Sequence, residues 1–190
     1  MRKAFLISGF IAAAALAVFV TSAAAPANFA GTWSLDKAKS TGLSSRMQNA
    51  DSVVWTITQD GKTISIDSKI TGGQPPAGGG SGGGTGGGMG GGRGAGMGGP
   101  QVYNVDGSET TADVGGGQMT GKATNKATWS GDGAKLELAR KSVFQGPNGE
   151  VTSTTTQNLS LSGDGKVLTA VVHSESPRGT SDSTLVFNKQ

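Results

Sequence analysis

Apolar and polar residues alternate with a period of two along most of this chain, and this pattern predicts β-strands rather than helices. In the segment 29–36, Phe29, Gly31, Trp33 and Leu35 fall on one side, while small or polar residues occupy the other. Gly31 lets a backbone or a ring approach closely, and Trp33 is large enough to fill much of a small core. The same alternation predicts further strands within the segments 53–57, 64–70, 102–105, 110–114, 119–129, 136–144, 151–161, 167–173 and 185–187.

The most sharply defined local element is a hairpin around Asp60-Gly61. If these two residues form a type I′ loop, Gln59 and Lys62 are the closing pair. Both apolar sets then fall on one face, which a slip of one residue would destroy. Counting outward from the turn, the predicted apolar pairs are Ile57 with Ile64 and Trp55 with Ile66.

Three polar junctions with similar composition separate alternating segments, as hairpin turns do. They are Thr58-Gln59-Asp60-Gly61-Lys62, Ser130-Gly131-Asp132-Gly133-Ala134-Lys135 and Ser162-Gly163-Asp164-Gly165-Lys166. Strands joined hairpin by hairpin form an antiparallel meander. The segment 37–50 is predicted to be mainly a loop that tolerates a short helix. We therefore predict an all-β domain that closes into a barrel, because closure removes exposed edges, with a two-sheet sandwich as the alternative.

The first 25 residues have the composition of an export signal. Met1-Arg2-Lys3 is positively charged, the segment 4–20 is largely apolar, and small residues follow. The apolar segment is shorter than the roughly 20 residues of a membrane-spanning helix. We predict a signal peptide over 1–25 that is cleaved within residues 23–27, with a retained membrane anchor as the alternative. A single domain over 26–190 remains.

This domain is interrupted by a glycine-rich insert over 72–99. The insert holds 18 of the 34 glycines of the chain. Ordering it would cost about 1–2 kcal/mol of backbone entropy per residue, which its few apolar side chains cannot return by burial. We predict a disordered loop between two strands. A phosphate-binding glycine loop is not predicted, since no strand-then-helix context surrounds the glycines.

Charge and cysteine content exclude several classes of function. The net charge is +3, but Arg2 and Lys3 belong to the predicted signal and leave 14 basic against 13 acidic residues. The remaining charge of about +1 and the lack of a basic cluster argue against a nucleic-acid partner. The chain has no cysteine, which excludes disulfides, thiolate metal sites and cysteine nucleophiles.

No catalytic constellation is visible. His173 is the only histidine and ends a Val-rich strand beside Ser174-Glu175, where a surface residue is expected. The segment from Gly116 to Lys122 matches half of a phosphate loop, but Ala123 stands where Ser or Thr would hold magnesium. Met89 and Met97 are expected to be loop residues rather than copper ligands. We predict no enzyme, no metal site and no cofactor.

The aromatic and aliphatic residues of the inner face permit two interpretations. They fill the core, or they line a cavity, because barrels of about eight strands leave room for one small ligand and many inward positions here are small. On the second interpretation, the candidate ligand-binding residues are Trp55, Ile57, Ile64, Ile66, Tyr103 and Trp129.

Two motifs resemble a known family. Gly31-Thr32-Trp33 on a first strand resembles the Gly-x-Trp opening of lipocalins and related calycin barrels. Together with the hairpin sequence Leu161-x-x-Asp164-Gly165-Lys166-x-Leu168-Thr169, it is similar to small secreted bacterial lipocalin-like proteins. The resemblance spans about residues 28–190 and implies that Trp33 packs at the closed end of the barrel. It also implies a late arginine over Trp33, for which Arg178 is the candidate.

We therefore expect a secreted or periplasmic lipocalin-like barrel that binds a small apolar ligand. The alternative is a cell-envelope module with a filled core, whose glycine-rich insert contacts an envelope partner. On neither hypothesis does the mature protein span a membrane or bind nucleic acid. The two hypotheses differ in whether the inside of the barrel accepts a ligand.

Overall fold

The structure is a computed structural model that describes residues 25–72, 99–116, 119–146 and 149–190. The predicted signal peptide and nearly all of the glycine-rich insert lie outside these residues, so the predictions made for them stay predictions. The described elements are β1 (Gly31–Leu35), α1 (Ser45–Asn49), β2 (Ser52–Gln59), β3 (Thr63–Thr71), β4 (Gln101–Asn104), β5 (Thr110–Gly116), β6 (Met119–Trp129), β7 (Lys135–Gly146), β8 (Gly149–Leu161), β9 (Val167–Ser176) and β10 (Gly179–Lys189).

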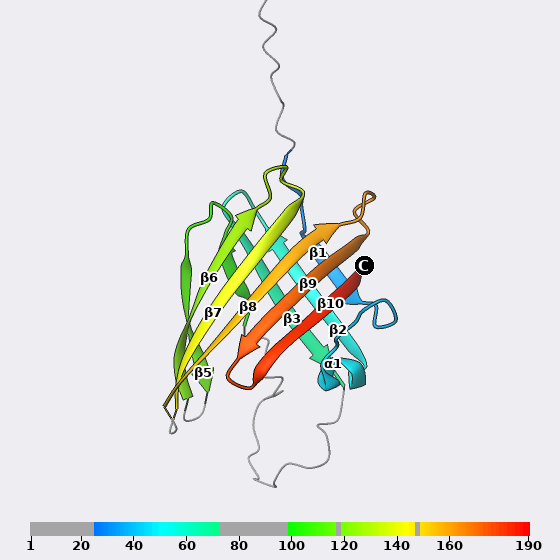
Figure 1. Cartoon of the computed structure of the whole chain (residues 1–190). Helices are drawn as coiled ribbons and strands as arrows, with labels where there is room; N and C mark the ends of the chain where they lie inside the picture. Colours follow the sequence, from blue (N-terminus) through cyan, green and yellow to red (C-terminus); the bar gives the residue numbers. More distant parts are fainter. Residues whose placement is uncertain (1–24, 73–98, 117–118, 147–148) are drawn as a thin grey trace, which may run out of the picture.

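All ten strands belong to one antiparallel sheet, with the order β4-β3-β2-β1-β10-β9-β8-β7-β6-β5. Neighbours in the sheet are neighbours in sequence except where β1 pairs with β10, which places Leu35 opposite Phe187. The sheet curls so that β7 to β10 cross in front of β2 and β3 (Figure 1). The predicted all-β meander and its closure into a barrel are confirmed, and the sandwich alternative is wrong.

The barrel is closed by side chains where its two end strands meet. β4 does not form a ladder with β5, although it lies close to β6. The carbonyl oxygen of Val102 on β4 accepts hydrogen bonds from Thr110 Oγ1 at 2.7 Å and from Asn125 Nδ2 at 3.0 Å. These bonds satisfy a carbonyl group that would otherwise lie on an open sheet edge. The described part of the barrel is therefore nearly closed.

The predicted β2–β3 hairpin is present, but the predicted pairing at its turn is wrong by two residues. Gln59 pairs with Ile64 and not with Lys62. Gly61 lacks the positive φ that a type I′ turn requires, and Asp60 Oδ1 accepts hydrogen bonds from the backbone N–H groups of Lys62 and Thr63, both at 2.7 Å. Because the error is an even number of residues, the same side chains still face inward.

The other two predicted junctions are identical hairpin turns. In the β6–β7 turn, Ser130 Oγ donates to Asp132 Oδ1 at 2.6 Å and accepts from the N–H of Lys135 at 2.9 Å. The β8–β9 turn repeats both bonds at the same distances with Ser162, Asp164 and Val167. Each turn ends on a glycine with φ near 68°, and the bonds hold the pKa of both aspartates below the usual value.

The end of the barrel that carries these three turns is packed shut. It is the upper end in Figure 1, where the chain enters the barrel from above. The entering segment is fixed by Ala27, whose N–H donates to the carbonyl of Gly133, and by the side chain of Gln59, which bonds the backbones of Ala27 and Phe29 at 2.9 Å each. The largest apolar side chains buried in the barrel are Trp33, Tyr103, Phe29, Phe187, Ile57, Ile64, Leu136, Leu138, Leu159 and Leu168.

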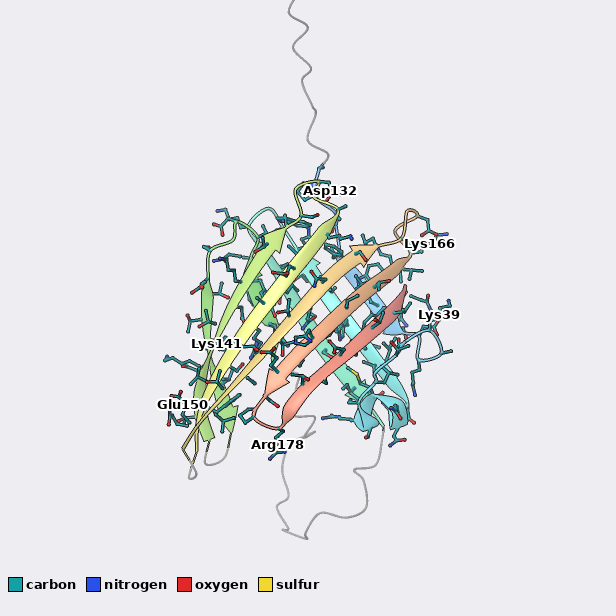
Figure 2. All side chains as sticks on the ribbon, viewed as in Figure 1. Lys39, Asp132, Lys141, Glu150, Lys166 and Arg178 are labelled. Carbon is teal, nitrogen blue, oxygen red and sulfur yellow. The ribbon has the colours of Figure 1, made fainter. Side chains whose placement is uncertain are left out.

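Trp33 lies at this closed end, as the resemblance implies, but the cation over its ring is a lysine. The indole Nε1 donates to the carbonyl of Phe29 at 2.9 Å, and Lys189 Nζ lies 5.2 Å from the ring centroid. Arg178 instead lies exposed in the turn between β9 and β10, at the opposite end of the barrel (Figure 2). The expectation for Arg178 is corrected, because only the last residues of β10 run beside β1.

The segment between β1 and β2 forms a corner at the open end that contains α1. Ser44 caps this helix, since its hydroxyl accepts a hydrogen bond from the N–H of Met47 at 3.3 Å. Lys37 Nζ donates to the carbonyl of Gln48, within the helix, and to that of Ala50, which directly follows it. Among the described residues, no helix has the length and apolar character needed to cross a membrane.

Candidate functional site

The six residues predicted to touch a ligand mostly belong to the packed core. Five of them are at most 5% exposed, and the sixth, Trp129, is partly buried and stacks on Phe29 with ring centroids 6.0 Å apart. Trp55 packs against Phe187 at 4.4 Å. This packing agrees with the filled-core interpretation for the closed half of the barrel. The five buried residues are Trp55, Ile57, Ile64, Ile66 and Tyr103.

Two hollows in the described structure lie on the outer wall. The larger, about 510 Å³, spans β6 to β8 and is bordered by threonines and Ala139 together with Lys126, Arg140, Lys141 and Glu109. The smaller, about 270 Å³, lies beside it near Glu175 and Pro177. Their linings are mainly outward-facing polar side chains, and no described aromatic side chain lines either of them. We assign them no role.

The inner face of the barrel is polar in the half away from the three turns, which we call the open half. Asn125 on β6, Arg140 on β7, Thr155 on β8 and Ser174 on β9 pair directly in register, so their side chains form one row across four strands. The next row toward the open end is also small or polar, with Ala123, Ser142 and Ser153 in register. The inner face therefore changes from large apolar groups to polar groups halfway along the strands.

Arg140 is the one charged side chain in these two rows. It is partly buried, and its Nε donates to Ser142 Oγ at 3.3 Å. No carboxylate among the described residues forms an ion pair with it. Burial lowers the pKa of Arg140 from its usual value, but a guanidinium remains charged at neutral pH. The barrel thus holds a partly desolvated positive charge without a counterion in the described part of the chain.

Tyr103 on β4 lies near this charge and is fully buried. Its hydroxyl donates to Gln101 Oε1 at 2.9 Å. Burial raises the pKa of Tyr103 to about 12, which the positive charge of Arg140 opposes. The hydroxyl therefore stays protonated at physiological pH and adds no negative charge beside Arg140.

Three buried polar atoms in the described barrel have no hydrogen-bond partner. They are Trp55 Nε1, Asn125 Oδ1 and Gln157 Oε1. Asn125 is directly opposite Arg140, and Gln157 is diagonal to it, because Gln157 follows Thr155 by two residues on β8. Leaving a buried polar atom unpaired costs about 1–3 kcal/mol. A water molecule or a ligand in the barrel would remove that cost.

A partly exposed apolar row lies at the lower ends of β5 to β8. Val114, Gly121, Phe144 and Val151 are in register across the four strands. The Phe144 ring covers Gly121, where a Cβ would lie 3.0 Å from it. Val151 is 38% exposed although its register places it on the inner face. Apolar side chains exposed at the mouth of a barrel are suited to contact the hydrocarbon part of a ligand.

His173 lies outside the barrel, as predicted. Its Nδ1 bonds Asp182 Oδ1 at 2.6 Å, and its Nε2 bonds Glu175 Oε1 at 3.3 Å. The bond to Asp182 and then the bond to Glu175 hold the pKa of His173 above its usual value. Both ring nitrogens are therefore engaged by carboxylates, and the ring is not paired with a nucleophile.

The polar residues of the inner face were not predicted from the sequence, although the alternation contained a signal for them. Arg140 follows Leu136 and Leu138 at even spacing, and Gln157 precedes Leu159 by two residues. In a strand this spacing places polar and apolar residues on the same face. Whether Arg140 has a carboxylate partner depends on residues far away in the sequence. No local pattern therefore indicates that the described residues provide none.

Comparisons with known proteins give a distant structural likeness. No protein-family model and no curated protein matches this chain. A crystal structure of zebrafish ileal bile acid-binding protein in complex with cholic acid is similar over 85% of this chain and 98% of that chain, with 14% sequence identity and a TM-score of 0.45. The barrel fold itself is shown by the strand pairing of this chain. The function proposed below rests on residues of this chain.

Proposed function

We propose that the protein binds a small amphipathic anion in the open half of its barrel. The acid group would pair with Arg140, and the hydrocarbon part would lie against the apolar row of Val114, Phe144 and Val151 at the mouth. This hypothesis refines the apolar ligand expected from the sequence, because the inner face is polar in its middle. The single observation that supports it most is the partly buried Arg140 without a described carboxylate partner.

The charge of Arg140 favours an anion for a physical reason. Removing a guanidinium from water costs free energy that a paired carboxylate can offset. A guanidinium also matches a carboxylate with two parallel hydrogen bonds, which are stronger than bonds between neutral groups. A neutral hydrocarbon would leave this charge without a partner and would be a poorer ligand.

A titration with a fluorescent fatty-acid analogue tests the proposal. We expect saturable binding at one site and an affinity about tenfold to a hundredfold lower in Arg140→Gln, since a charged hydrogen bond contributes about 1.5–3 kcal/mol. Lys141→Gln is the matched control, because Lys141 is the next residue on β7 and is exposed. It should bind the probe like the wild type.

Two results would contradict the proposal. Wild-type protein that shows no saturable uptake would favour the envelope module with a filled core. Equal losses of affinity in Arg140→Gln and Lys141→Gln would mean that the probe responds to net charge and not to the inner site.

We also propose that the protein works outside the cytoplasm, on the basis of its N-terminal sequence alone. The charged and apolar segments of residues 1–25 should direct export, so the mature chain should begin between Ala24 and Asn28. Intact-mass measurement of protein recovered from the envelope or the medium tests this. A species that retains Met1 in the membrane fraction would support the membrane-anchor alternative.

A further inference from the structure

Gln157 is a polar residue in a row of the inner face that is otherwise mainly apolar. It pairs with Leu138 on β7 and with Val172 on β9. Its Oε1 is buried without a partner in the described structure, although the residue as a whole is partly exposed. A methionine or leucine would fill this position without an unpaired polar atom, so packing does not explain the amide.

Asn125 presents a second unpaired acceptor on the other side of Arg140. It is 2% exposed, and its Nδ2 is used by the carbonyl of Val102. Its Oδ1 is buried without a partner. Asn125 and Arg140 are opposite one another, and Gln157 lies one row closer to the packed end. Asn125 and Gln157 each lie within about 5–8 Å of Arg140 in these opposite and diagonal positions, but β7 separates the two from one another. A small molecule held at Arg140 can therefore reach either oxygen, and a single hydroxyl group cannot bond both.

The two unpaired atoms are carbonyl oxygens, so they need hydrogen-bond donors. A carboxylate has no proton to donate, and a hydrocarbon chain has none either. A hydroxyl group donates one hydrogen bond and fits beside a carboxylate that is held by Arg140. The acceptors are close to Arg140 in the register of β6 to β8, so the hydroxyl would lie near the acid end of the ligand and away from the mouth.

We propose that Gln157 selects a ligand with a hydroxyl group close to its acid group, such as a 3-hydroxy fatty acid. This inference rests on the proposed function, because it assumes that the acid group lies at Arg140. Ordered water on the two oxygens is the competing explanation, and it gives no preference for a hydroxylated ligand.

Three twelve-carbon acids distinguish these explanations: dodecanoic acid, 3-hydroxydodecanoic acid and 12-hydroxydodecanoic acid. We expect the wild type to bind the 3-hydroxy acid about threefold to tenfold more tightly than dodecanoic acid, the range of one neutral hydrogen bond. The 12-hydroxy acid should gain nothing, since its hydroxyl would lie at the apolar mouth. Titration calorimetry measures all three affinities directly.

Gln157→Met is the decisive variant, because methionine has a similar length and no amide. It should bind dodecanoic acid at least as well as the wild type and should lose most of the preference for the 3-hydroxy acid. Gln145→Met is the matched control, since Gln145 is an exposed glutamine near the lower end of β7 that bonds Glu150. This control should keep the full preference.

A second measurement does not depend on any variant. In ¹⁵N-labelled wild-type protein, the side-chain amide resonances of Gln157 should shift with the 3-hydroxy acid and stay nearly unchanged with dodecanoic acid. The inference is overturned if the wild type binds both acids equally, if Gln157→Met keeps the preference, or if those resonances do not distinguish the acids. Protein that binds none of the three acids would instead contradict the proposed function itself.

Discussion

At the scale of single residues, the inner face of the barrel follows two different rules. Near the packed end, residues such as Trp33 and Phe187 are fully buried, and the polar Nε1 of Trp33 is satisfied by a backbone carbonyl. Halfway along the strands, Asn125 and Gln157 each present a buried oxygen without a partner. Native proteins rarely leave such atoms unpaired, and Trp55 Nε1 in the packed part is a third such atom. The two oxygens are distinguished from it by their positions opposite and diagonal to Arg140, on which the proposed site is based.

His173 gives a residue-scale prediction for pH. Asp182 and Glu175 raise its pKa in the folded state above the usual value of 6.5. The stability that these bonds contribute is therefore fully present below pH 6.5 and is lost as the pH rises through the raised folded pKa. We expect the melting temperature difference between the wild type and His173→Gln to be larger at pH 5.5 than at pH 8.5.

Asp182→Asn serves as the control for this prediction. It removes the largest of the interactions that raise the pKa of His173, so most of the pH dependence should disappear in this variant as well. A difference between wild type and His173→Gln that is the same at both pH values would contradict the assignment.

At the scale of elements, the turns are the part of the fold that the sequence specifies most directly. The β8–β9 turn places Gly165 at a φ of 67°, a region that residues with a Cβ rarely adopt. No atom lies within 4 Å of a Cβ built at Gly165 or at Gly163, and only Gly165 has a positive φ. The two glycines therefore differ in backbone conformation and not in the space around them.

This difference gives a matched pair of substitutions. Gly165→Ala should lower the free energy of unfolding by about 1–2 kcal/mol, the cost of a left-handed backbone for a residue with a side chain. Gly163→Ala should change it by less than about 0.5 kcal/mol. Urea unfolding of both variants measures this. Similar losses in the two variants would mean that the turn geometry is not the cause.

The strand alternation and the turn residues were sufficient to predict the hairpins and the meander. They were insufficient for the register at Asp60, because the carboxylate bonds to Lys62 and Thr63 select a turn with no positive φ at Gly61. They also did not indicate that Lys189 covers Trp33, since this contact depends on the long-range pairing of β1 with β10. Local patterns predict elements well and predict contacts between distant elements poorly.

At the scale of the whole molecule, one end of the barrel is packed and the other presents polar and apolar rows to solvent. Closure was predictable, because ten strands in one meander leave two edges that are best brought together. The hydrogen bonds from the side chains of Thr110 and Asn125 to Val102, which close the barrel, were not predictable. β4 and β5 form no ladder, so the strand alternation does not indicate how they meet. The division into two halves follows from where Arg140 and its neighbours fall in the register.

The proposed pairing of a bound acid with Arg140 is tested most directly by titrating the ligand itself. Dodecanoic acid labelled with ¹³C at its carboxyl group should give one bound resonance in the presence of the protein. Because Arg140 favours the carboxylate, the pKa of the bound acid should lie below that of the free acid, and Arg140→Gln should abolish this shift in whatever ligand remains bound. No bound resonance, or a bound acid whose pKa is the same in the wild type and in Arg140→Gln, would contradict the proposed site.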